Sequence, residues 1–277
     1  MRVQGYYRHP TIHTGSVVFV SEDDLWMVSA AGGSAVRLTA NPGSQSGPRF
    51  SPDGTLLAFV SRDEGQRDVH VMDRAGGPSR RLTYFGAATT IVAGWRPSGD
   101  RIVVATDHRQ PFPGWTHLWD VPVDGSAAVP LRLGPAFSVG FGRSGRGVVL
   151  GRNTFDPARW KRYRGGRAGT LWIDRTSSGT FRELVDLDGN VAFPLWVGRR
   201  IYFVSDHEGV GNLYSTTPTG RDLRRHTAHD EFYVRYPSTD GERIVYQCGG
   251  DLWVFDPTAD ETRRLDVTIP SARPQRN

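Results

Sequence analysis

The sequence predicts an all-β protein, a six-bladed β-propeller made of four-stranded antiparallel blades. Two observations predict this fold. Short runs of β-branched and aromatic residues alternate with turns rich in Gly, Pro and Asp along the whole chain. A unit of such runs recurs six times, with 39 to 51 residues between equivalent positions. The equivalent positions are Leu38, Leu82, Leu133, Leu184, His226 and Leu265.

The clearest repeat covers residues 48–83 and predicts four strands. Its first strand ends at Phe50, and the Ser51-Pro52-Asp53-Gly54 turn follows. Proline presets its own φ, and glycine accepts the positive φ that such a turn requires. The other three predicted strands cover residues 56–61, 69–73 and 80–83.

Six such sheets can bury both of their faces by packing side by side around an axis. We expect a single domain over residues 1–267, followed by a tail, 268–277, that leads to downstream domains. The expected blades are 6–39, 46–83, 92–133, 137–184, 191–227 and 232–267. Each repeat begins with its innermost strand and ends with its outermost strand. The ring is therefore predicted to close without strand exchange, by packing of the first blade against the last.

One aromatic residue recurs on the third strand of five repeats. A single aromatic at a fixed place in each repeat predicts packing between blades rather than a ligand cage. The residues are Trp26, Trp119, Trp172, Tyr214 and Trp253.

The composition favours a cytoplasmic protein without nucleic-acid or membrane partners. The 34 basic and 29 acidic residues give a net charge of +5, and five cations within residues 159–167 account for all of it. Nucleic-acid binding usually spreads basic residues over a face. The single cysteine, Cys248, excludes an internal disulfide. Neither a signal peptide nor a membrane-spanning run is visible.

No residue pattern points to catalysis, a cofactor or a metal. Gly142–Arg146 is the nearest approach to a nucleophile elbow, but it lacks the last glycine. Asp206, His207 and Glu208 are adjacent, and we expect them to lie in a solvated blade loop. A glycosidase or lyase would need two acids near the axis, and the predicted inner strands contain almost none.

Several stretches resemble the N-terminal six-bladed propeller of the tricorn protease family. The most specific is "GRNTFDPARWKRYRGGRAGTLWID", residues 151–174. The others are "VSEDDLW" (20–26), "SDHEGVGNLYS" (205–215), "DLRRHT" (222–227) and "TDGERIVYQCGGDLW" (239–253). The resemblance extends over nearly the whole chain, blade by blade.

The resemblance implies a large cytosolic serine peptidase that degrades oligopeptides released by the proteasome. In that family the propeller is a non-catalytic channel for peptide products, and the catalytic serine and histidine lie in later domains. The expected partners are oligopeptides, the downstream peptidase domains and sister subunits of a homo-hexamer. The alternative reading is a free-standing Tol-type propeller that binds proteins or peptides.

One departure concerns the connection between the second and third blades. In part of the family, a pair of arginines in this connection is proposed to hold the carboxylate of the substrate. Here residues 84–92, "YFGAATTIV", contain no cation. The resemblance therefore leaves open how this chain would hold that carboxylate.

The basic stretch of residues 158–170 is the long connection between the second and third strands of the fourth blade. Trp160, Tyr163 and the Gly165-Gly166 pair predict a folded loop held against the body of the protein. We rank a structural or subunit-contact role first, attraction of peptide carboxylates second, and nucleic acid last. The candidate contact residues are Arg159, Lys161, Arg162, Arg164 and Arg167.

Overall fold

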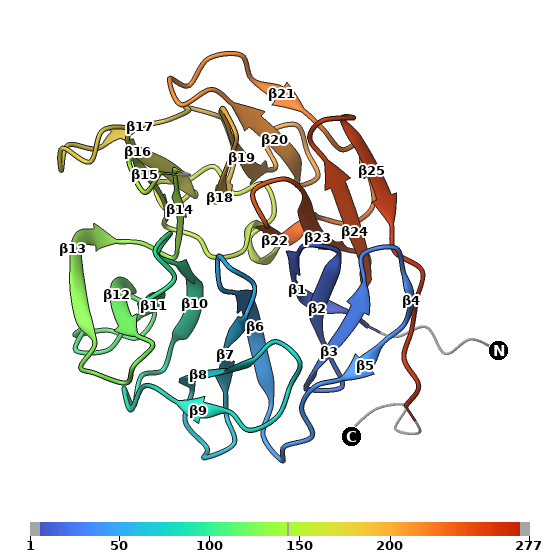
Figure 1. Ribbon diagram of the computed structural model, residues 1–277. Coiled ribbons are helices and arrows are strands. Elements are labelled where there is room, and N and C mark those ends of the chain that lie inside the picture. The colour runs from blue at the N-terminus through green and yellow to red at the C-terminus, as the bar shows by residue number, and fades with distance from the viewer. Residues whose placement is uncertain (1–5, 143, 272–277) are drawn as a thin grey trace.

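The computed structural model describes residues 6–142 and 144–271, and it confirms the predicted fold class. Six four-stranded antiparallel sheets are arranged as the blades of a ring (Figure 1). Within each blade the strands follow one another in chain order from the axis outwards. The described residues contain no α-helix and one 3-10 helix, η1 (Pro157–Arg159).

The first three blades are formed by the N-terminal half of the chain. Blade one contains β1 (Arg8–His13), β2 (Ser16–Ser21), β3 (Asp24–Ser29) and β5 (Val36–Arg37). Blade two contains β6 (Gln45–Phe50), β7 (Leu56–Ser61), β8 (Asp68–Asp73) and β9 (Arg80–Arg81). Blade three contains β10 (Thr90–Trp95), β11 (Arg101–Thr106), β12 (His117–Pro122) and β13 (Val129–Pro135).

The C-terminal half forms the other three blades. Blade four contains β14 (Ser138–Phe141), β15 (Val148–Arg152), β16 (Thr170–Asp174) and β17 (Arg182–Glu183). Blade five contains β18 (Val191–Val197), β19 (Arg200–Ser205), β20 (Asn212–Thr216) and β21 (Arg224–Arg225). Blade six contains β22 (Arg235–Thr239), β23 (Ile244–Cys248), β24 (Asp251–Asp256) and β25 (Glu261–Arg264).

Blade two shows how closely the repeat predicts the strands. β6 ends at Phe50 and β7 covers the predicted residues, while β8 begins one residue before the prediction. Gly54 has φ +72 in the turn between β6 and β7, as the Pro-Asp-Gly sequence requires. The fourth strand is shorter than predicted and ends at Arg81.

The core consists of six clusters of buried apolar side chains, each shared by two neighbouring blades. Trp26 belongs to the cluster between blades one and six, and Tyr214 to the one between blades four and five. Trp253 packs against the cluster between blades five and six, and Trp119 is buried beside Phe85 of the connection between blades two and three. These contacts confirm the predicted role between blades for four of the five third-strand aromatics. The fifth, Trp172, contacts Arg152 and Thr170 of its own blade.

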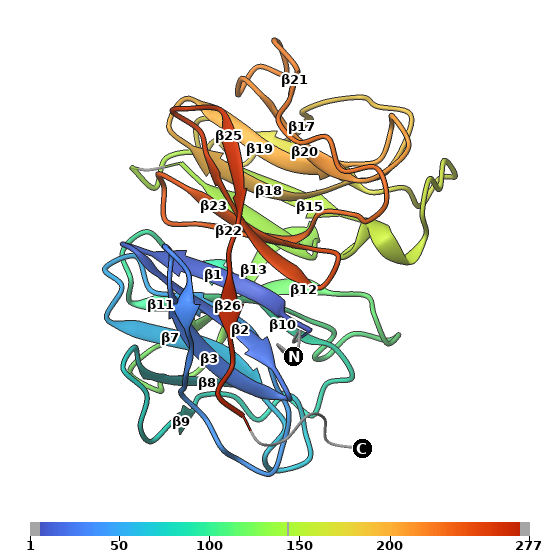
Figure 2. The ribbon, with the colours of Figure 1, turned by 90° about the vertical axis from the view of Figure 1, so that its right-hand side faces the viewer.

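The ring closes without strand exchange, because no four-stranded sheet in the described residues combines strands from both ends of the chain. Packing of blade one against blade six is nevertheless not the only contact that closes the ring. β26 (Val267–Thr268) pairs in parallel with β4 (Gly33–Ser34) and crosses the expected boundary between residues 267 and 268. The Tyr7 hydroxyl also donates to the Val267 carbonyl at 3.1 Å. The end of the described chain is thus hydrogen-bonded to blade one (Figure 2).

Candidate functional site

A cavity of about 430 Å³ occupies the centre of the ring. It is lined by residues of the innermost strand of every blade, namely β1, β6, β10, β14, β18 and β22. Asp240 and Glu242 line it from the turn after β22, whereas Arg49 lines it from an inner strand. None of the six inner strands contains an acidic residue. The cavity therefore has a cationic wall and carboxylates only at a turn.

Four of the inner strands carry a bulge just before a proline. The strand register shifts at His9-Pro10, Gly47-Pro48, Phe193-Pro194 and Tyr236-Pro237, and the residue before each proline has positive φ. A bulge interrupts the hydrogen-bond ladder, so proline's missing N–H is tolerated there. Left-handed backbone is unfavourable for the three side chains other than glycine. The fold thus positions these three side chains at a local cost in backbone conformational energy.

The strained residues form an aromatic cluster between blades five, six and one. The ring of Tyr236 lies edge-on to the ring of His9 at 4.2 Å and to the ring of Phe193 at 5.7 Å. Phe193 also lines the central cavity. Burial, followed by the charges of Arg8, Arg49 and Arg235, lowers the pKa of His9 to about 3, so this imidazole is neutral near pH 7.

The basic loop, residues 153–169, is held against the inner strands by Asp156. This buried carboxylate accepts a hydrogen bond from Arg235 Nε at 3.1 Å and one from the Tyr236 hydroxyl at 3.2 Å. Burial alone would lower the pKa of Arg235, but the hydrogen bond and charge of Asp156 raise it. Burial and the Asp156 charge together raise the pKa of Tyr236 to about 12. The loop of blade four is thus tied to the aromatic cluster.

Asp206 holds the same loop from blade five. Its side chain is buried and accepts hydrogen bonds from the main-chain N–H groups of Arg162 and Asn190, each at 2.7 Å. The Asn190 side chain also donates to the Trp160 carbonyl at 2.9 Å. The expectation that Asp206 lies in a solvated loop is wrong, because its carboxylate satisfies main-chain donors that the folded loop would otherwise leave unpaired. The prediction of a folded loop held against the body is confirmed.

The five candidate cations are all exposed, and the structure does not gather them at one point. Arg159 stacks on the ring of Phe155 at 4.5 Å, and the Lys161 amine lies 5.5 Å from the ring of Tyr233. Arg164 forms an exposed ion pair with Asp188 at 2.9 Å. Arg162 donates its main-chain N–H to Asp206. The residues Arg162 and Arg167 are both exposed. Figure 2 shows the loop, with its short yellow-green helix η1, projecting at one face of the ring.

Arg49 is a cation outside the basic loop, and its sequence context does not mark it as a site residue. Its Nη1 donates to the carbonyl oxygens of Pro48 at 3.0 Å and Pro10 at 3.4 Å. Among the described residues, no carboxylate lies within ion-pair distance of it. Burial lowers the pKa of Arg49 to about 10, and the side chain remains charged at neutral pH.

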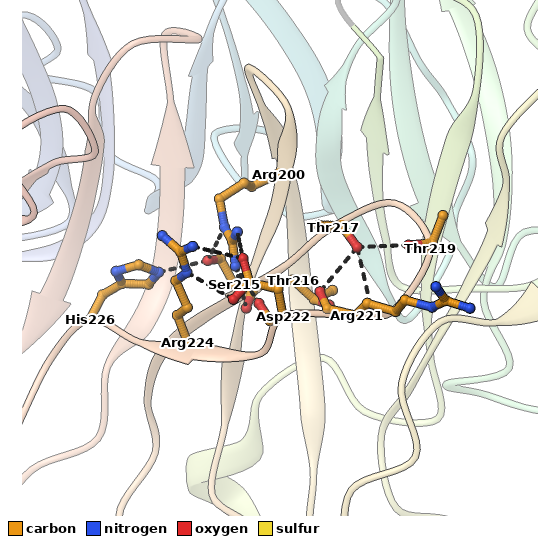
Figure 3. Close-up of polar contacts among 9 residues, drawn as sticks. All are labelled: Arg200, Ser215, Thr216, Thr217, Thr219, Arg221, Asp222, Arg224 and His226. Atoms are coloured by element: carbon orange, nitrogen blue, oxygen red, sulfur yellow. Dashed lines mark hydrogen bonds and ion pairs between the residues drawn. The ribbon is translucent and has the colours of Figure 1, made fainter.

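Ser215, His226 and Asp260 line up between blades five and six in the order of a hydrolytic triad. His226 Nε2 lies 2.6 Å from Ser215 Oγ, and His226 Nδ1 lies 2.5 Å from Asp260 Oδ1. Figure 3 shows that Arg200 also points at Ser215, and its Nε donates to the same Oγ at 2.7 Å. Ser215 is completely buried, so no substrate can reach its hydroxyl. The arrangement ties together the outer strands of the two blades.

Within residues 6–142 and 144–271, no group of three or more His, Cys, Asp or Glu side chains could hold a metal ion. These ranges also contain no helix that is long and apolar enough to span a bilayer.

Comparison with known proteins places this geometry among relatives. Residues 4–261 match the family described as the tricorn protease N-terminal beta propeller domain. The chain is 44% identical to tricorn protease homolog 1 of Streptomyces coelicolor over 272 residues, 97% of this chain and 25% of that protein. It is 31% identical to a putative tricorn-like protease N-terminal subunit of Sulfurisphaera tokodaii, over 64% of this chain and 91% of that one. The crystal structure of the tricorn protease superposes with a TM-score of 0.89 at 36% identity, over 99% of this chain and 27% of that one.

Proposed function

The chain belongs to the tricorn protease family as its N-terminal β-propeller domain, and from this premise we propose that it is the non-catalytic peptide channel and scaffold of a tricorn-like serine peptidase. It spans about a quarter of the length of the Streptomyces relative. The proposal therefore assigns hydrolysis of oligopeptides to peptidase domains outside this chain. It includes assembly with those domains and with further copies of the chain in the cytoplasm.

The observation that carries the proposal is the cavity at the centre of the ring. All six inner strands line it, so every blade offers a surface to a peptide in the cavity. Its walls combine apolar residues such as Trp95 and Leu195 with the Arg49 cation, a mixture that suits a peptide main chain and its carboxylate end. The name of the Sulfurisphaera relative describes an N-terminal subunit separate from the rest of its protease, which supports a scaffold role for such a chain.

In the same proposal, the basic loop contacts peptides or a neighbouring subunit through its exposed cations. The candidates are Arg159, Lys161, Arg162, Arg164 and Arg167. Their positive potential would attract peptide carboxylates over several ångströms and would be weakened by salt. Neutralising Arg162 and Arg164 should change particle size or peptide affinity, and unchanged values of both would remove this part of the proposal.

The channel itself is tested by filling it. A Cβ at Gly94, on inner strand β10, would meet no atom within 4 Å, and Gly94 lines the cavity. Gly94→Phe should therefore occupy the channel without displacing backbone. We expect it to weaken binding of a fluorescein-labelled hexapeptide at least tenfold, whereas Ala127→Phe in an exposed turn of blade three should not. Equal affinity of both variants would contradict binding in the channel.

A further inference from the structure

Arg49 offers hydrogen-bond donors to the central cavity that no group of the protein accepts. A guanidinium carries five N–H donors. The two hydrogen bonds of Arg49 both come from Nη1 and both end on main-chain carbonyls. Nε and Nη2 donate to no described group, and neither nitrogen is fully buried. These two nitrogens are therefore open to the cavity that Arg49 lines.

The charges around Arg49 do not cancel its own. Arg8 is paired with Asp23, and Arg235 is paired with buried Asp156. Arg49 is the only cation among the described residues that line the cavity. His9 lies close enough to feel the charge of Arg49, but it is neutral near pH 7 and accepts a hydrogen bond from the Gly47 N–H. Arg49 is thus a cation without an ion-pair partner on the inner strands, and the carboxylates of the cavity, Asp240 and Glu242, lie at the turn after β22.

A guanidinium held in this way is suited to one kind of ligand. Main-chain carbonyls fix one edge of the planar group, so the open Nε and Nη2 edge can bind two oxygens of an oxyanion side by side. Carboxylate and phosphate both present such oxygens. The cavity as a whole has mostly apolar walls, and such surroundings strengthen a charge-assisted hydrogen bond.

We propose that Arg49 is an oxyanion site that binds the terminal carboxylate of a peptide in the central channel. The choice of a peptide carboxylate over free phosphate rests on the proposed function. Arg49 belongs to inner strand β6, so this contact would orient a peptide with its carboxyl end against blades one and two. The site adds a direction to a channel that would otherwise hold a peptide in either orientation.

Isothermal titration of the full chain with two hexapeptides of one sequence tests this site. One peptide has a free carboxylate and the other a carboxamide end. We expect the acid to bind about tenfold more tightly, as one charge-assisted bidentate contact provides. Arg49→Gln should bring the two affinities within twofold of each other, and Arg49→Lys should keep part of the difference. Arg132→Gln, on an exposed outer strand, should keep all of it.

Each alternative result of the titration contradicts one specific claim. Equal binding of acid and amide to the unaltered chain contradicts the carboxylate site and leaves the peptide channel standing. A tenfold preference that survives in Arg49→Gln assigns the carboxylate to another group. Phosphate that binds as tightly as the peptide acid makes the site one for a free oxyanion. Absence of binding by either peptide contradicts the channel itself. If Arg49→Gln does not fold, the carboxylate site is tested by comparing the acid and amide peptides on the unaltered chain and on Arg49→Lys.

Discussion

Asp156 of blade four accepts a hydrogen bond at 3.1 Å from Arg235 on the innermost strand of blade six, 79 residues along the chain. The Asp156 side chain is 0% exposed, and that of Arg235 is 28% exposed. A buried charge pair of this kind is costly to break, because the remaining partner loses its counter-charge. Asp156 is therefore one of two buried carboxylates, with Asp206, that fix the position of the basic loop.

Asp156→Asn should destabilise the protein by about 2 kcal/mol, since the Arg235 cation is left without a carboxylate. The value lies below that of a fully buried pair because Arg235 is partly solvated. Urea unfolding measures the loss. The loop, which then keeps only its anchor at Asp206, should also be cleaved faster by trypsin between residues 159 and 167.

A matched control lies in an exposed ion pair of the same loop. Arg164 and Asp188 are 57% and 71% exposed. Asp188→Asn should change stability by less than about 0.5 kcal/mol, because water already screens the pair. Similar losses in the two variants would show that burial of Asp156 is not what fixes the loop.

Stability should fall as the pH falls below about 6.5, through His9. The pKa of this imidazole drops from 6.5 to about 3 on folding, so the unfolded chain binds more protons between these values. Between pH 7.5 and pH 5, His9 alone should remove about 2 kcal/mol of stability. His9→Asn does not titrate, and Asn tolerates the φ of +50 found there. Equal pH dependence of the unfolding free energy in both proteins would refute this role.

The parallel contact between β26 and β4 should contribute to ring closure. Val267 packs against the cluster of blades one and six, so Val267→Asp should cost about 1–2 kcal/mol. The amides of Gly33 and Ala35, which donate to Asp266 and Thr268, should then exchange faster with deuterium. Val36→Asp is the control, since Val36 is 61% exposed on β5. Unchanged amide protection in Val267→Asp would assign closure to packing alone.

Ser215 should be chemically inert despite its alignment with His226 and Asp260. Its buried hydroxyl should not react with a fluorophosphonate, and mass spectrometry of the treated protein checks this. Ser215→Ala should cost about 1–3 kcal/mol, because Arg200 and His226 lose a buried partner. Covalent labelling at Ser215 would mean that a substrate can enter this interface and that the chain is a hydrolase in its own right.

The repeat predicts the blades because their strands are local features. The strand Leu56–Ser61, for example, follows a turn whose Pro, Asp and Gly residues lie within four consecutive positions. Such local signals can be read directly from the sequence. The tandem order of the units then favours a ring, as found. The shortness of the outer strands, such as Arg80–Arg81, escaped prediction because solvated strand ends carry no hydrophobic pattern.

The candidate site could be predicted only in part. The basic loop was found from its charge, but its anchors, Asp156 and Asp206, were not, because their partners lie far away in sequence. The bulges were detectable in principle, since His9, Phe193 and Tyr236 each precede a proline on an expected inner strand. Arg49 carries no sequence signal, because an unpaired cation differs from a paired one only in three dimensions.

The most direct test is photo-crosslinking of the full chain with a hexapeptide that carries a benzophenone group beside its free carboxylate. We predict crosslinks to residues of several inner strands around the cavity, such as Arg49, Gly94 and Ser138, and their loss in Gly94→Phe. Crosslinks confined to the outer strands, or a pattern that Gly94→Phe does not change, would contradict a peptide channel at the centre of the ring.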